Sequence, residues 1–195
     1  DTFNRYYEPE NVRSAIRVLK KAGYFPFIPT LENSKKILCC GRTYLTNGLI
    51  NHAKKEVLNI LETYRPYLKN GISVVGLEPS CILSFRDEIP NMIKNKETNY
   101  LKNNTYTFEE LLSKHSEELK FKKLTKKVLL HGHCHQKAFD VVKPIEDILK
   151  NIKGAEIETI ETSCCGMAGS FGYDKGTYDI SMKMANEKLF PAIKK

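Results

Sequence analysis

The residues that decide the fold are Ser163-Cys164-Cys165-Gly166-Met167-Ala168-Gly169-Ser170-Phe171-Gly172-Tyr173. They place two adjacent thiols and three glycines between a strand-like run and a helical one. Adjacent cysteines are poorly placed to bind one tetrahedral ion together, but they suit a polynuclear centre in which neighbouring thiolates bind different metal atoms. Glycine lets backbone amides approach such a centre, because it has no side chain and tolerates positive φ. The stretch therefore predicts a metal or redox site.

The same signal occurs 125 residues earlier, as Cys39-Cys40-Gly41. With that offset Pro66 corresponds to Pro191, so each cysteine pair precedes a loop and a helix that meets a proline at the same distance. Self-similarity at a fixed spacing indicates a repeated structural unit. We therefore expect one domain built from two pseudo-repeated halves, at about 1–100 and about 127–195, with a linker at about 101–126.

The second half is expected to be incomplete. The first copy continues through an apolar strand to Cys81, and the counterpart of Cys81 would fall at position 206, beyond Lys195. The first residue is Asp1 and not methionine, so we expect an excised fragment. Its N-terminus therefore gives no information on a signal peptide.

Composition narrows the possible classes. The chain of 195 residues suits one domain with a sizeable core. Its net charge of +8 is spread over many lysines, which predicts a solvated surface and no nucleic-acid partner. No apolar run approaches the ~20 residues that span a bilayer. Six cysteines without the density of a disulfide scaffold indicate a reducing compartment. We therefore expect a cytoplasmic protein, either free or bound peripherally at the inner face of the membrane.

Strand-like and helix-like runs alternate along the chain. Strands are predicted at residues 24–28, 36–38, 72–76, 128–130 and 157–160. Helices are predicted at residues 9–22, from residue 47 to beyond Pro66, and in a segment that contains Phe85. Further helices are predicted to begin at residue 107, to lie on both sides of a break at Pro144, and to lie near the C-terminus. This alternation is typical of α/β proteins and predicts a Rossmann-like parallel sheet with helices on both faces.

Two helices carry clear apolar stripes, and one segment carries none. The buried stripes are predicted to be Ile50, Ala53, Val57, Leu61 and Tyr64 in the long helix, and Tyr178, Met182, Ala185 and Leu189 in the last one. Residues 91–106 are rich in Asn, Lys and Thr, and we expect a surface insertion there. Thr107 and Glu110 after it are spaced as a capping box that opens a helix.

All the cysteines lie where a predicted strand ends and a loop begins. In a parallel sheet such ends lie at one edge, where open α/β folds bind ligands. We therefore expect the six thiols to reach one region of space, these being Cys39, Cys40, Cys81, Cys134, Cys164 and Cys165.

Four motifs together resemble the cysteine-rich CCG domain over essentially the whole chain. They are Cys39-Cys40-Gly41, Gly76-Leu77-Glu78-Pro79-Ser80-Cys81, His131-Gly132-His133-Cys134-His135-Gln136 and Cys164-Cys165-Gly166-Met167-Ala168-Gly169-Ser170-Phe171-Gly172. This domain occurs in the B subunit of heterodisulfide reductase and in the iron–sulfur subunits of glycolate oxidase and anaerobic glycerol-3-phosphate dehydrogenase. The sequence is most similar to the C-terminal part of fused FAD-linked oxidase/ferredoxin-type dehydrogenases of D-2-hydroxy acids.

The resemblance implies an iron–sulfur cluster, of [4Fe-4S] type. A full family motif is a lone cysteine, then CCG, then CxxC. Cys39, Cys40 and Cys81 match the CCG and the last cysteine of a first motif, and Cys134, Cys164 and Cys165 match the start of a second. The first motif departs from the pattern, because no cysteine precedes Cys39 and Glu78 replaces the first cysteine of CxxC. The resemblance thus implies one cluster at most, with these six cysteines as candidate ligands.

Other groups are expected beside the metal. Gly41 and Gly166 are candidate contacts to the cofactor through their amides, and His131, His133 and His135 are candidates for hydrogen bonds to a sulfur or for ligation. Glu78 is expected to be an N-terminal helix charge beside Pro79, or a carboxylate ligand.

The function that the resemblance implies is electron transfer. A flavin domain carrying FAD would oxidise a 2-hydroxy acid of the glycolate, D-lactate or 2-hydroxyglutarate type, and electrons would pass through ferredoxin-type clusters to this domain and on to an acceptor such as a quinone. This chain shows no flavin-binding stretch and no catalytic base, so no catalytic residue is predicted in it.

Two other classes stay open. A disulfide or thiol redox domain of the heterodisulfide reductase type would use Cys164 and Cys165 as a dithiol. A structural interaction module would instead hold zinc with four of the six cysteines.

Overall fold

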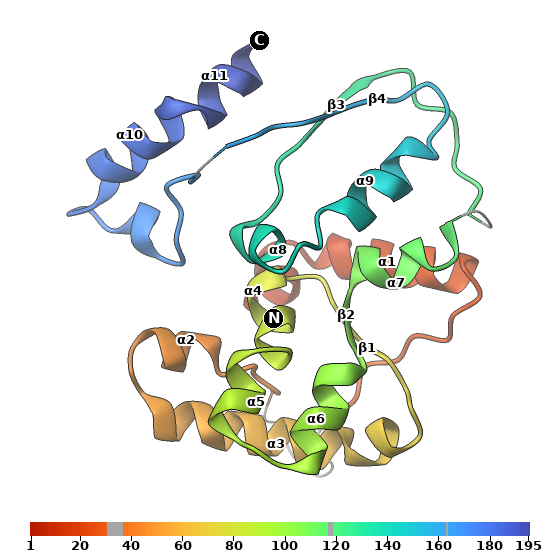
Figure 1. The fold of residues 1–195 in the computed structure, drawn as a ribbon, viewed down its shortest axis with the longest axis vertical. Helices are drawn as coiled ribbons and strands as arrows, with labels where there is room; N and C mark the ends of the chain where they lie inside the picture. Colours follow the sequence, from red (N-terminus) through yellow and green to blue (C-terminus); the bar gives the residue numbers. More distant parts are fainter. Residues whose placement is uncertain (31–36, 117–118, 163) are drawn as a thin grey trace. The chain divides into compact units, whose positions relative to one another are not determined.

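The computed structural model describes residues 1–30, 37–116, 119–162 and 164–195. The chain divides into two compact units, Asp1–Leu119 and Lys120–Lys195. Each unit contains one pair of parallel strands accompanied by helices (Figure 1).

The first unit is mainly helical. Its elements are η1 (Phe3–Tyr7), α1 (Pro9–Lys21), α2 (Arg42–Thr46), α3 (Ile50–Lys69), β1 (Val74–Gly76), α4 (Pro79–Ile82), η2 (Leu83–Phe85), α5 (Glu88–Met92), α6 (Lys96–Asn103), β2 (Thr105–Thr107) and α7 (Phe108–Ser113). Strands β1 and β2 are parallel, with Val74 opposite Thr105 and Gly76 opposite Thr107. The helices between them form the crossover that a parallel pair requires.

Helix α3 supplies much of the first core. Ala53 and Val57 have no exposed surface, and Leu61 is 1% exposed, as the apolar stripe predicts. Two stripe positions differ from the prediction: Ile50, in the first turn, is 44% exposed, and Tyr64 is only half-buried. Ile60 and Leu68 complete the buried face, so this face is shifted by part of a turn.

The prediction of a surface insertion at residues 91–106 is wrong. This segment contains α6 and β2, and its Leu101 is fully buried. Asn95 and Thr98 form a capping box that starts α6, and the hydroxyl of the buried Thr105 donates to the carbonyl of Leu101. Polar side chains thus satisfy buried backbone groups here, which is why the segment lacks an apolar signature.

The predicted capping box at the next helix is confirmed. The Thr107 hydroxyl accepts a hydrogen bond from the amide of Glu110, and the Glu110 carboxylate accepts one from the amide of Thr107. Leu111 and Leu112 of α7 are buried behind it.

The second unit contains β3 (Lys127–Leu130), α8 (Cys134–Ala138), α9 (Lys143–Lys150), β4 (Glu156–Thr159), η4 (Phe171–Tyr173), α10 (Tyr178–Glu187) and α11 (Leu189–Lys194). Strands β3 and β4 are parallel, with Leu130 opposite Thr159. The predicted break at Pro144 is present, since α8 ends before it and α9 begins beside it.

The C-terminal helical region differs in detail from its prediction. It is divided into α10 and α11, and Ala185 and Leu189 are buried as expected. Tyr178 is instead 53% exposed, and Ser181 is buried in the same turn because it packs against the glycine of the second cysteine motif.

These observations support the α/β class. The described residues form two separate two-stranded parallel sheets. Residues 24–28 form no regular strand, nor do Ile37 and Leu38, and Lys36 lies outside the described residues. A Rossmann-like sheet with two repeats stays a prediction.

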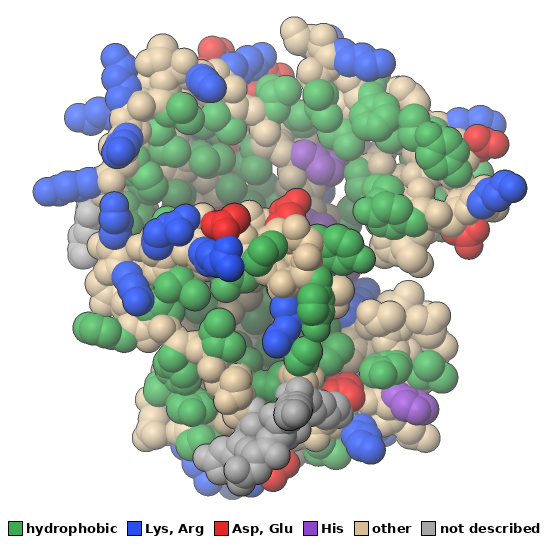
Figure 2. Space-filling model, turned by 180° about the vertical axis from the view of Figure 1, so that it is seen from behind, with side chains coloured by type: hydrophobic (Ala, Val, Ile, Leu, Met, Phe, Trp, Pro, Cys, Tyr) green, Lys and Arg blue, Asp and Glu red, His purple; other side chains and the backbone are tan. Residues whose placement is uncertain are grey.

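The surface agrees with the expected spread of charge. Figure 2 shows Lys and Arg side chains distributed over many parts of the face in view, with apolar side chains between them. Among the helices that the structure describes, none combines the length and hydropathy needed to cross a membrane.

Candidate metal and redox centre

The first cysteine motif is a tight turn before α2. Gly41 has φ of 78°, in the left-handed region, and its amide donates a hydrogen bond to the sulfur of Cys39 at 3.5 Å. A Cβ on Gly41 would lie 3.2 Å from the backbone of Ala53 in α3. Glycine is therefore required both by the backbone conformation and by the close approach of a helix.

Cys81 approaches this motif from α4, just after β1. Glu78 is the N-cap of α4, and its carboxylate accepts hydrogen bonds from the amide and the hydroxyl of Ser80. This confirms the predicted helix-terminal role of Glu78. Helix α4 holds the sulfur of Cys81 at 3.1 Å from the sulfur of Cys40.

The three thiols of the first unit influence one another's pKa values. The hydrogen bond with Cys40, followed by burial, raises the pKa of Cys39 above its ordinary value. Cys39 lowers the pKa of Cys40, but Cys81 and burial outweigh this effect and raise it to about 11. The hydrogen bond that Cys40 donates lowers the pKa of Cys81. Cys81 is thus the favoured thiolate of this set.

The second cysteine motif has the same local geometry. Gly166 has φ of 85°, and its amide donates a hydrogen bond to the sulfur of Cys164 at 3.3 Å. A Cβ on Gly166 would lie 2.3 Å from the carbonyl oxygen of Ser181 in α10, whose hydroxyl donates to the carbonyl of Gly166. Both motifs therefore hold the first sulfur with a glycine amide and pack that glycine on a following helix.

In the second unit, the parallel strands bring two cysteine segments to one edge. Because Leu130 pairs with Thr159 in parallel register, the chain leaves both strands at the same edge toward Cys134 and Cys164. The Lys137 ammonium donates to the carbonyl oxygen of Thr162 at 3.0 Å, which links α8 to the segment that precedes Cys164.

The histidines lie around this edge. The ring of His131 makes a hydrogen bond with the Thr162 hydroxyl at 3.0 Å, and burial together with Lys137 lowers its pKa. His133 is the N-cap of α8, and its Nδ1 accepts from the amide of His135. The rings of these two stack at 5.2 Å. In the structure, His131 and His133 thus orient the backbone near Cys164 and at the start of α8. Ligation of a metal by the histidines stays a prediction.

The chemical type of the donors is what can be compared with a metal centre. Within residues 1–30, 37–116, 119–162 and 164–195, no three His, Cys, Asp or Glu side chains are grouped closely enough to hold one metal ion. Thiols are nevertheless the ligands of iron–sulfur clusters, whose separate iron atoms are bound by separate thiolates. Amide hydrogen bonds to sulfur, present at Cys39 and Cys164, are one of the features that tune such clusters. The residues therefore fit this group. Each set of three thiols is described within its own unit, and one shared centre stays a prediction.

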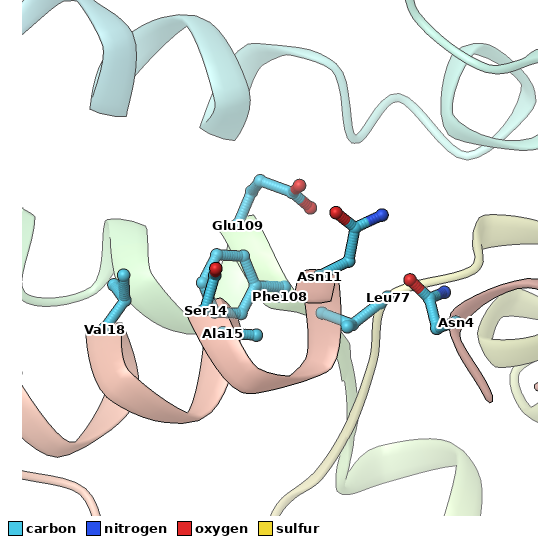
Figure 3. Close-up of a pocket in the computed structure, with 8 residues that line it drawn as sticks. All are labelled: Asn4, Asn11, Ser14, Ala15, Val18, Leu77, Phe108 and Glu109. Carbon is cyan, nitrogen blue, oxygen red and sulfur yellow. The ribbon is translucent and has the colours of Figure 1, made fainter. Parts of the chain in front are cut away.

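Two features were not predicted from the sequence. Arg42 of α2 forms an ion pair with Glu88 of α5. A cavity of about 290 Å³ is lined by η1, α1, the residue after β1 and the start of α7 (Figure 3). The carboxyl group of Glu109 and the amide group of Asn11 point to the same side of it. Burial raises the pKa of Glu109. Only the spacing of polar residues on α1 could have indicated this cavity.

Comparison with known families finds one match. Residues 128–194 match the model of the CCG family, described as a cysteine-rich domain. This region contains β3, β4 and the Cys134, Cys164 and Cys165 segments.

Similar curated proteins cover most of the chain. The C subunit of anaerobic glycerol-3-phosphate dehydrogenase from Escherichia coli K12 is 28% identical over 183 residues, which are 92% of this chain and 45% of that protein. D-2-hydroxyglutarate dehydrogenase of Haemophilus influenzae is 26% identical over 93% of this chain and 18% of that protein. Lactate utilization protein A of Bacillus subtilis is 26% identical over 78% of this chain and 65% of that protein. The chain thus spans less than half the length of the first two. No solved structure matches.

Proposed function

We propose that this chain is an iron–sulfur electron-transfer domain of an oxidoreductase acting on a hydroxy acid or a related alcohol, because its residues 128–194 match the model of the cysteine-rich CCG family. The observation that carries the proposal is the repeated turn in which a glycine amide donates to the sulfur of the first of two adjacent cysteines. This turn presents one thiol with an oriented N–H group and leaves the second thiol beside it.

The candidate ligands are the six cysteines, and the proposed cluster is of [4Fe-4S] type. Bound to them, the cluster would accept and release single electrons. The chain's own residues would hold it. Gly41 and Gly166 would keep the amides on Cys39 and Cys164, and α4 would hold Cys81 beside Cys40.

In the second unit, Lys137 would fix the path of the chain toward Cys164. Its ammonium donates to the carbonyl oxygen of Thr162, two residues before Cys164, so we expect its positive charge to lie close to a cluster bound there. A nearby positive charge favours the more negative, reduced form of a cluster and so raises its reduction potential. His131, on the same Thr162 hydroxyl, would orient that segment.

The relatives support the proposed partners. They are named as dehydrogenases of glycerol-3-phosphate and D-2-hydroxyglutarate and as a lactate utilization protein. We therefore propose that a flavin domain, carrying FAD, and ferredoxin-type clusters on the same protein or complex deliver electrons to this chain. A quinone is the proposed acceptor, which fits a cytoplasmic protein that is peripheral at the membrane.

The predicted pseudo-repeat is also retained as a proposal. Besides the two glycine turns, the offset of 125 residues places α3 on α10 and α11, and Pro66 of α3 on Pro191 of α11. Each unit also has one parallel strand pair, although the offset does not place one pair on the other. The glycine turns and the helices after them are what supports two halves of Rossmann-like α/β type.

The direct test is cluster assembly on the chain without oxygen. Reconstituted protein should contain about four irons and four acid-labile sulfides per chain and give an EPR signal on reduction. Cys40→Ser and Cys165→Ser each remove one candidate ligand from one unit, so a variant that loses iron shows that its unit supplies a ligand to the cluster. Ser170→Ala changes an exposed residue of the second motif and should leave the iron content unchanged.

Iron that does not bind, or that binds equally to all these variants, would contradict the proposal. Stoichiometric zinc in its place, lost with the same cysteines, would favour the structural module instead.

A further inference from the structure

Cys40 and Cys81 form a contact that the proposed electron transfer does not explain by itself. Their sulfurs are 3.1 Å apart although the residues are 41 positions apart in the chain. A disulfide has sulfurs at about 2.05 Å, so closure needs a relative movement of about 1 Å. Both residues are partly exposed, and a small molecule in solvent can therefore reach them.

The two cysteines are held by different elements. Cys40 lies in the glycine turn before α2, and Cys81 lies in α4, which Glu78 caps. Cys81 is also fixed through its carbonyl oxygen, which accepts a hydrogen bond from the Ser84 hydroxyl at 2.7 Å. The contact is thus formed by ordered backbone on both sides, within one unit of the fold.

We propose that Cys40 and Cys81 are a redox-active dithiol that is oxidised to a disulfide by low-molecular-weight disulfides when no metal is bound. One thiolate attacks a sulfur of the small disulfide, forms a mixed disulfide and releases one thiolate, which takes up a proton. The second cysteine then attacks the protein sulfur of the mixed disulfide, and the other small thiol leaves. The two protein thiols lose two electrons and two protons, and the small disulfide gains both as two thiols.

This chemistry would control loading of the metal. A disulfide leaves neither sulfur as a thiolate, and metals bind the thiolate form. Oxidation would thus withdraw two candidate ligands from the first unit and reduction would restore them. This consequence rests on the proposed function, whereas formation of the disulfide does not.

The experiment treats the metal-free chain with oxidised glutathione and then with N-ethylmaleimide under denaturing conditions. Four of the six thiols should be alkylated, and the unalkylated oxidised protein should be about 2 Da lighter than the reduced one. Peptide mapping should find the Cys40 peptide joined to the Cys81 peptide. Dithiothreitol should restore six alkylated thiols.

Matched variants identify the pair. Cys40→Ser and Cys81→Ser should each prevent the internal bond and give instead a glutathione adduct on the remaining thiol. Cys134→Ser removes an exposed thiol elsewhere and should leave the bond intact. Six alkylatable thiols after oxidation, or a bond mapped to another pair, would overturn the proposal.

Iron loading is then measured on the oxidised and the reduced protein. Iron that binds only after reduction supports the control of loading. If iron binds neither form while the disulfide forms, the cluster proposal fails and the dithiol stands. If iron binds and no disulfide forms, the dithiol proposal fails and the cluster proposal stands.

Discussion

At the scale of single residues, glycine is the residue that both cysteine motifs depend on. The sequence shows the repeated cysteine and glycine pattern, and it predicted amide contacts from Gly41 and Gly166 to a cofactor, which stay a prediction. The structure shows each amide donating to a cysteine sulfur. The sequence could not show what each glycine packs against, because Ala53 and Ser181 lie far along the chain on other elements. The expected convergence of the thiols includes Cys40 and Cys81, but the direct contact of these two sulfurs could not be derived from the sequence.

Replacing Gly166 with alanine should destabilise the second unit more than the same change at Gly169. Both have positive φ, which costs about 1–2 kcal/mol for alanine. At Gly166 the new Cβ would also meet the Ser181 carbonyl at 2.3 Å, whereas at Gly169 nothing lies within 4 Å. We expect a loss of about 1 kcal/mol for Gly169→Ala and about 3 kcal/mol for Gly166→Ala, measured by urea unfolding. Equal losses would show that the close approach is absent in solution.

Glu109 provides a pH-dependent prediction. Burial raises the pKa of its carboxyl group, so the folded state holds this proton to higher pH than the unfolded state does. The folded state is therefore favoured at low pH and loses this advantage as pH rises through the raised pKa. Glu109→Gln should increase the free energy of unfolding at pH 7, and the gain should disappear near pH 4.

Urea midpoints at both pH values test this prediction. Glu62→Gln, at an exposed position of α3, is the control and should change neither midpoint. A gain that is equal at pH 7 and pH 4 would mean that the charge of Glu109 is not its cause.

At the scale of elements, the sequence predicted those with an apolar signature. The strands at residues 128–130 and 157–160 and the break at Pro144 were found, because short apolar runs and proline act locally. Helix α6 and strand β2 were missed, because Leu101 alone carries their apolar burial and polar residues such as Thr105 carry the rest. Tertiary contacts, which no local pattern encodes, decide such segments.

The link between α8 and the end of β4 can be tested through the reactivity of Cys164. Lys137→Met keeps the aliphatic stem and removes the charged hydrogen bond to the Thr162 carbonyl. Such a bond contributes about 1.5 kcal/mol, so local opening should become about tenfold more frequent. Alkylation of Cys164 in the metal-free, reduced protein should accelerate by about that factor.

Lys143→Met is the control for this measurement, because Lys143 forms an exposed ion pair with Asp147 within α9. Its effect on the alkylation rate should be small. An unchanged rate in Lys137→Met would show that the link does not restrain the second cysteine motif.

At the scale of the whole molecule, each unit combines a cysteine pair, a glycine turn and a parallel strand pair. The sequence predicted the α/β class, and its prediction of two pseudo-repeated halves stays a prediction. The order of the strands within one sheet could not be derived from it. Residues 31–36, which lead to the first motif, lie outside the described residues. The departures from the family pattern, Glu78 above all, fall in the first unit, which is where the Cys40–Cys81 contact lies.

A disulfide in the first unit should change the stability of the molecule. Joining residues 41 positions apart reduces the entropy of the unfolded chain, which corresponds to about 4 kcal/mol in the loop-closure model. The metal-free oxidised chain should therefore unfold at a urea concentration higher by on the order of 1–2 M than the reduced chain. Hydrogen exchange should slow in α3 and β1, which lie within the closed loop. Cys40→Ser exposed to the same oxidant should show neither change. If the oxidised protein were instead less stable, the closure of about 1 Å would have to be costing more than the loop entropy provides, and the two sulfurs would be poorly preorganised for the bond.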